Sequence, residues 1–95
     1  MITTKQRAKL RGMANSLDVL VHIGKDGFSP NVMQKLEDEL FAHELVKCSV
    51  LQNCDITARE AITQAAEKTG CEIVQVIGKK FVVYKPNPEK PIIIV

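Results

Sequence analysis

Aromatic residues are scarce in this 95-residue chain, which contains no tryptophan, one tyrosine and three phenylalanines. Proteins that grip single-stranded nucleic acid by base stacking need several aromatic side chains, so a stacking platform is not expected. The scarcity leaves contacts to a phosphate backbone open, because those contacts need cations and backbone N–H groups instead.

Long apolar segments are also missing. No uninterrupted apolar run exceeds four residues, as in Ile92–Val95, whereas a membrane-spanning helix needs about 20. The first residues lack the apolar core of a secretory signal, so the cytoplasm is the expected location. With 45% hydrophobic and 25% charged residues, the composition is that of a single globular domain. A domain of this size leaves little room for a deep active site.

Paired cysteine motifs are absent, because Cys48, Cys54 and Cys71 do not form a Cys-x-x-Cys spacing. A structural zinc site uses four ligands, commonly in short paired spacings. His22 and His43 could be recruited in principle, but their spacing does not call for a metal. We therefore expect reduced, mostly buried thiols, with neither a metal nor a cofactor.

The net charge of +2 conceals an uneven distribution. The first 12 residues contain no acid and four cations, namely Lys5, Arg7, Lys9 and Arg11. Residues 37–47 hold four acids against one lysine, which makes that segment −3. Separated charge is typical of a domain with one electropositive face for a phosphate-rich partner, although a solvated helix face with no partner would look the same.

Hydrophobic periodicity and turn residues predict seven elements in the order α-β-α-β-α-β-β. The predicted helices cover 4–16, 30–43 and 57–69, and the predicted strands cover 19–23, 45–51, 71–77 and 80–84. The expected helix signals are Thr3 or Thr4, Ser29 before Pro30, a Thr57–Glu60 capping box, and Gly70 as the stop. The order predicts an α/β fold with one four-stranded mixed sheet and helices packed on it.

Three further expectations follow from this pattern. The nearly continuous apolar run 19–23 predicts a strand covered on both faces. Gly78-Lys79 predicts a type II′ hairpin turn between the last two strands. Prolines at 86, 88 and 91 exclude a regular central strand, so we divide the chain into a domain, 1–86, and a tail, 87–95, that leaves it.

The most informative local feature is the loop Gly24-Lys25-Asp26-Gly27, between a strand and a helix that begins with proline. Glycines allow positive φ and close approach of another backbone, and a helix start offers N–H groups and partial positive charge. These properties favour phosphate binding, with Lys25 as a mobile cation. Two glycines in a strand-to-helix turn are also common without any ligand, and the Walker A and dinucleotide motifs are absent.

The sequence resembles the CRM domain family, named for chloroplast RNA splicing and ribosome maturation, from about Thr4 to Lys85. The matching blocks are 9–11 with Ala14, 21–27, 44–47, 65–70, 74–79 and 83–85. The resemblance implies a fold similar to the C-terminal domain of bacterial translation initiation factor three. It also implies RNA binding through the Gly-x-x-Gly loop and neighbouring basic residues. A single-domain chain looks like the bacterial members, which are associated with precursors of the large ribosomal subunit.

We therefore expect a monomeric RNA-binding protein that contacts structured ribosomal RNA, with no membrane and no small-molecule substrate as partner. The predicted RNA-binding residues are Gly24, Lys25, Asp26, Gly27, Lys5, Arg7, Lys9, Arg11, Lys79 and Lys80. The alternative is a protein-interaction module that uses the acidic segment 37–39 or the apolar tail 92–95. An enzyme is not expected, because no nucleophile, base and orienting group stand at a defensible spacing.

Overall fold

The computed structural model describes residues 2–89, 91 and 93. Each of its three helices begins after a residue whose side chain caps the first turn. The helices are α1 (Thr4–Ala14), α2 (Pro30–His43) and α3 (Ala58–Thr69). Reciprocal capping boxes form at Thr3 with Gln6 and at Thr57 with Glu60, whereas the Ser29 hydroxyl alone caps α2. The predicted helices are thus confirmed, although α1 ends two residues earlier than expected. Among the described residues, no helix is long and apolar enough to cross a membrane.

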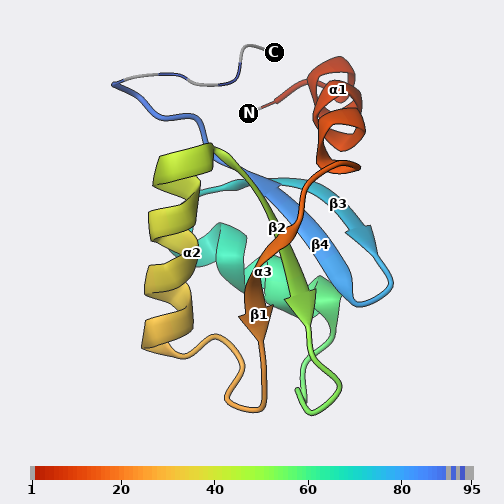
Figure 1. Ribbon diagram of the computed structural model, residues 1–95, viewed down its shortest axis with the longest axis vertical. Coiled ribbons are helices and arrows are strands. Elements are labelled where there is room, and N and C mark those ends of the chain that lie inside the picture. The colour runs from red at the N-terminus through yellow and green to blue at the C-terminus, as the bar shows by residue number, and fades with distance from the viewer. Residues whose placement is uncertain (1, 90, 92, 94–95) are drawn as a thin grey trace.

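Four strands form one mixed sheet in the order β1-β2-β4-β3 (Figure 1). They are β1 (Val19–Ile23), β2 (Leu45–Val50), β3 (Glu72–Ile77) and β4 (Lys80–Tyr84). β1 is parallel to β2, and β4 is antiparallel to both β2 and β3, so β4 alone runs in the opposite direction. The predicted element order and mixed sheet are confirmed. Gly78 has φ +58 and Lys79 does not have positive φ, which fits the expected type II′ turn.

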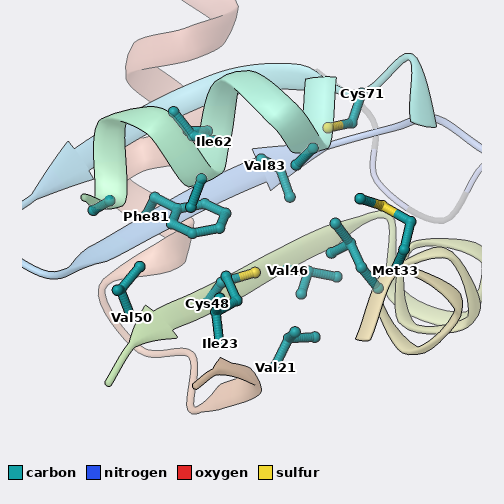
Figure 2. Close-up of a cluster of buried hydrophobic side chains, with 14 of the residues drawn as sticks. Val21, Ile23, Met33, Val46, Cys48, Val50, Ile62, Cys71, Phe81 and Val83 are labelled. Atoms are coloured by element: carbon teal, nitrogen blue, oxygen red, sulfur yellow. The ribbon is translucent and has the colours of Figure 1, made fainter. Parts of the chain in front are cut away.

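The larger core lies between the sheet and the pair α2 and α3 (Figure 2). Alternate residues of each strand point into it, with Ile23, Cys48 and Phe81 from three neighbouring strands. The helix α3 contributes small residues and Ile62, as its thin apolar face predicts. The two helices on this face fix the position of the loops that join them to the strands.

The opposite face of the sheet is only partly covered. The helix α1 buries Leu10 and Ala14 there against Leu45, Val82 and other residues of β2, β4 and β3. β1 is an edge strand, and its outward residues Leu20 and His22 are exposed. The expectation that β1 is covered on both faces is therefore wrong, because α1 packs over the other strands.

A buried carboxylate connects the domain to its C-terminal residues. Glu44 is fully buried at the end of α2, with φ +65, and its Oε2 accepts the backbone N–H of Asn87. Its Oε1 accepts the N–H of Ile93 at 2.6 Å, and Ile93 packs against the α1 side of the core. The expected departure of the tail is therefore wrong for these residues. Of the apolar segment 92–95, only Ile93 lies within the described residues.

Candidate functional site

The Gly24–Gly27 loop is a tight turn at the carboxyl end of β1. The N–H of Gly27 donates to the carbonyl of Gly24 at 2.9 Å, and the N–H of Ser29 donates to the carbonyl of Gly27 at 3.0 Å. Lys25 and Asp26 occupy the tip and are exposed. The turn therefore presents one cation and one carboxylate side by side, and the backbone of the tip faces solvent.

The two glycines of this loop differ in what the fold demands of them. Gly27 has φ +62, a conformation that other residues adopt at a cost of about 1–2 kcal/mol. Gly24 has no such φ, and a Cβ there would lie 3.7 Å from Leu51 Cδ1, an ordinary contact. The fold itself thus accepts alanine at position 24, so a requirement for glycine there would have to come from a ligand.

The start of α2 offers fewer free donors than the sequence leads one to expect. Pro30 has no N–H, and the N–H of Val32 already donates to the Ser29 hydroxyl at 3.3 Å. The N–H of Met33 donates to the Ser29 carbonyl at 2.9 Å. Phe28, which follows the loop, packs towards the core, because its ring centroid lies 6.5 Å from that of the buried Phe81. These contacts hold the loop in place, and its exposed tip is better placed than the helix start to meet a phosphate.

The loop after β1, the loop after β2 and the β3–β4 turn all lie at the same end of the sheet (Figure 1). The N–H of Leu51, which begins the loop after β2, donates to the carbonyl of Ile23 at 2.8 Å. The N–H of Val50 donates to the carbonyl of Lys79 at 2.7 Å, which joins the β3–β4 turn to the same edge. Because strands lie about 4.8 Å apart, Gly24 and Lys79 stand roughly 10 Å from each other. The predicted residues Gly24–Gly27, Lys79 and Lys80 therefore form one group.

The cations of α1 form a second group. Arg7 Nε donates to the carbonyl of Ile73 at 3.0 Å, so this half-buried side chain partly serves to dock α1 on β3. Ile73 lies near the start of β3, four residues before Ile77, which pairs with Lys80. At about 3.3 Å per residue, the two groups are roughly 13 Å apart along the strands. The exposed Lys5, Lys9 and Arg11 are carried on the same helix.

The cysteines and histidines do not assemble into a reactive centre among the described residues. Burial, with a smaller contribution from Cys71, raises the pKa of the Cys48 thiol to about 12. Burial also raises the pKa of Cys71. A thiol with a raised pKa is a poor nucleophile at neutral pH. His43 Nε2 lies 3.5 Å from Glu39 Oε2 on the outer side of α2, and His22 is exposed on β1.

The predicted RNA-binding residues do not include four polar side chains that share a sheet face with Lys80. These are His22, Lys47, Ser49 and Gln75, which project from the sheet face that α1 leaves open. The signal was present as polar residues at alternate positions of the strands, such as 47 and 49 within an otherwise apolar run. Only the sheet order brings these positions from separate strands together.

Comparison with known proteins identifies relatives over nearly the whole chain. Residues 2–85 match the model of the CRS1/YhbY (CRM) domain. The chain is 35% identical over 89 residues to "Probable RNA-binding protein YqeI" of Bacillus subtilis, covering 94% of this chain and 93% of that protein. It is 33% identical over 91 residues to an "RNA-binding protein" of Haemophilus influenzae, covering 96% and 92%. The solution structure of hypothetical protein SAV1595 from Staphylococcus aureus is similar with a TM-score of 0.79 and 38% identity, covering 94% and 93%.

Proposed function

Because the chain belongs to the CRS1/YhbY (CRM) domain family, we propose that it binds RNA and that the Gly24–Gly27 loop contacts the RNA backbone. The observation that carries this proposal is the convergence of that loop with Lys79 and Lys80 at one end of the sheet. Among the described residues, Lys25, Lys79 and Lys80 have no salt-bridge partner, so their charges are available to phosphates. The names of the two bacterial relatives, which describe RNA binding, support the same function.

In this proposal the protein recognises the phosphate backbone and the shape of the RNA, and reads few bases. The residues at the tip of the loop are exposed, and glycine at 24 lets a phosphate approach without a side chain in between. The ammonium group of Lys25 neutralises the charge of that phosphate, while the carboxylate of Asp26 beside it repels a second phosphate. With few aromatic residues, the surface gains little from base stacking.

A salt series on a structured transcript of large-subunit ribosomal RNA tests this proposal. Four to six phosphate contacts on single-stranded segments of the transcript predict that the logarithm of the association constant falls with the logarithm of the salt concentration with a slope of about −3 to −4. We expect Lys25→Gln to make the slope shallower by about 0.7, the effect of one lost contact. A wild-type slope near zero would show that phosphates are not what the protein recognises.

The role of the loop has its own matched variants. Gly24→Ala adds only a Cβ that the fold accommodates, whereas Gly24→Asp adds a carboxylate at the same place. We expect Gly24→Asp to weaken RNA binding about tenfold or more, because the new carboxylate repels the phosphate at this position. A tenfold loss of affinity corresponds to about 1.4 kcal/mol of binding free energy. Equal affinities for wild type, Gly24→Ala and Gly24→Asp, all folded by circular dichroism, would remove the loop from the interface.

The cellular role we propose is assembly of the large ribosomal subunit by a cytoplasmic monomer that acts through binding and not through catalysis. The support is the similarity to bacterial members of the family, two of which are covered over 92% or more of their length, and the raised pKa of the buried Cys48 and Cys71 thiols. Sedimentation of a cell extract tests this role. We expect the protein in particles that sediment near the large subunit, and its confinement to the free fraction would contradict the role.

A protein-interaction surface is the second candidate. Phe41 on α2 is 66% exposed, next to Glu37 and beside the first tail residues. The hollow beside Phe41 is lined by Glu37 and also by Lys68 and Lys85, so charges of both signs surround an exposed apolar ring. This arrangement suits a protein partner. Phe41→Ser would separate the two functions, because it is expected to leave RNA affinity unchanged and to weaken only a protein contact.

A further inference from the structure

The sheet face beneath α1 is covered at one end and open at the other. The helix α1 buries Leu45 of β2 and Tyr84 of β4, which pair with each other near the end of the sheet that is remote from the Gly24–Gly27 loop. Nearer the loop, the same face carries a continuous row across all four strands. The row consists of His22, Ser49, Lys80 and Ile77, each paired in register with the next.

A second row lies between this open row and α1. Lys47 of β2 pairs with Val82 of β4, which in turn pairs with Gln75 of β3. A hollow of about 120 Å³ separates the end of α1 from these rows, and its polar lining comes from Asn15, Lys47, Gln75 and Lys80. The open area therefore combines two ammonium groups, two amides, a hydroxyl and an imidazole on a sheet face that measures about 14 Å across its four strands.

Charge on this area is of one sign. No acidic residue lines the hollow, and neither Lys47 nor Lys80 has a salt-bridge partner among the described residues. Asp18 lines a neighbouring hollow together with Lys47, but the two side chains form no salt bridge. Half-buried Lys47 thus holds an unpaired charge beside a hollow that Ala14, Ile77 and Val82 line together with the polar residues. The unpaired charge favours an anionic ligand.

We propose that this open sheet face is a second RNA contact, in which Lys47 and Lys80 bind phosphates and Ser49 and Gln75 bind ribose hydroxyls or base edges. The inference rests on the proposed RNA-binding function and deepens it. The face joins the two groups of cations, because its open row includes His22, two residues before the Gly24–Gly27 loop, and its hollow is lined by Ala14 and Asn15 at the end of the basic helix. One RNA segment can therefore run from α1 across the sheet to the loop.

RNA fits this face better than a protein partner does. Ile77, 61% exposed, is the large apolar group of the open row, so the row has little apolar area to bury. Protein–protein interfaces typically bury an apolar centre with few charges, whereas protein surfaces that bind nucleic acid are polar and positively charged. Hydroxyl and amide groups beside lysines also match the 2′-hydroxyls and phosphates that A-form RNA presents.

Charge-matched lysine variants test the inference with the ribosomal RNA transcript. Lys47→Gln is expected to lower affinity about five- to tenfold and to make the salt slope shallower by about 0.7. Lys35→Gln removes the same charge from the outer side of α2 and is expected to change affinity less than twofold. Equal losses in the two variants would show a general effect of net charge and would overturn the inference.

A second pair adds charge in place of removing it. Ser49→Glu inserts a carboxylate in the middle of the open row, and Thr63→Glu inserts one on the exposed side of α3. We expect at least a tenfold loss of affinity for Ser49→Glu and less than a twofold change for Thr63→Glu. If Ser49→Glu binds like wild type while Gly24→Asp does not, the loop function stands and the sheet contact is wrong.

Lysine footprinting on the unmodified protein covers the case in which a variant folds poorly. The RNA transcript is expected to protect Lys47 and Lys80 from acetylation and to leave Lys35 reactive. Unprotected Lys47 in the RNA complex would overturn the inference. Equal protection of Lys47 by polyglutamate at matched charge would overturn it in favour of an acidic protein partner, and a wild-type protein without RNA affinity would instead refute the proposed function.

Discussion

Cys48 lies at the centre of the sheet, where its thiol packs among apolar side chains of three strands. Its neighbours exclude water, and burial raises its pKa from 9.0 to about 12. A group of this kind stays protonated in the folded state at a pH at which the unfolded chain has already lost the proton. Its contribution to stability is therefore fully present below about pH 9 and is lost as the pH rises towards 12.

The corresponding prediction is a loss of stability in alkali that depends on this thiol. Between about pH 8 and 11, the free energy of unfolding of wild type is expected to fall more steeply than that of Cys48→Ala, measured with urea at each pH. Cys54→Ala, at a half-exposed cysteine, is the matched control and is expected to keep the wild-type slope. Parallel curves for wild type and Cys48→Ala would contradict the prediction.

For the two glycines of the Gly24–Gly27 loop, residue identity predicts the turn but not which glycine the fold requires. Their identity in the sequence predicts a tight turn, and the turn is present. Which glycine the fold itself needs depends on φ and on the space around each Cβ, and only Gly27 of the two has positive φ. Sequence cannot distinguish them because both conditions are set by how the loop rests on Leu51 and Ile56.

At the scale of elements, local signals place the helices and strands well. Caps at Thr3, Ser29 and Thr57 start helices where the sequence predicts them, because capping is an interaction among neighbours within three residues. The expected double coverage of β1 is wrong for a physical reason. An apolar run shows that a strand can be buried, but whether a helix covers its second face depends on where α1 docks.

The helix α1 offers a test of local energetics. Gly12 is exposed on it, and a Cβ added there would meet nothing within 4 Å, so Gly12→Ala is expected to stabilise the protein by about 0.5–1 kcal/mol. Gly70→Ala is expected to cost about 1–2 kcal/mol, because Gly70 ends α3 at φ +75. Denaturant midpoints measure both changes in stability. If the two variants shift the midpoint in the same direction, helix propensity and backbone strain do not determine the stability changes at these positions.

At the scale of the whole molecule, opposite charges lie on opposite sides of the sheet. The basic helix α1 packs on one face and the acidic helix α2 on the other. The sequence shows the separation along the chain, and the fold turns it into a separation in space. The cations of α1 also lie apart from the Gly24–Gly27 loop, a distance that the sequence does not reveal.

Glu44 couples the C-terminal residues to the body of the protein, so removing residues 87–95 has a defined expected effect. The deletion is expected to lower the free energy of unfolding by about 1–3 kcal/mol through lost hydrogen bonds to a buried carboxylate, while mass by ultracentrifugation stays that of a monomer. Glu44→Gln should be destabilising too, and Glu37→Gln, at an exposed position, should stay within about 0.5 kcal/mol. If wild type has a mass above that of a monomer, and the deletion variant has the mass of a monomer, the tail is an interface between copies of the chain.

The element order, the caps, the type II′ turn and the family can be read from the sequence alone, because they depend on neighbours along the chain or on ordered blocks of residues. The tertiary structure alone decided that β4 lies between β2 and β3, that α1 leaves β1 open, and that Glu44 holds the tail. The open row of His22, Ser49, Lys80 and Ile77 is the clearest case. Its residues come from four strands, and hydrogen bonding between strands, which no local pattern encodes, is what aligns them.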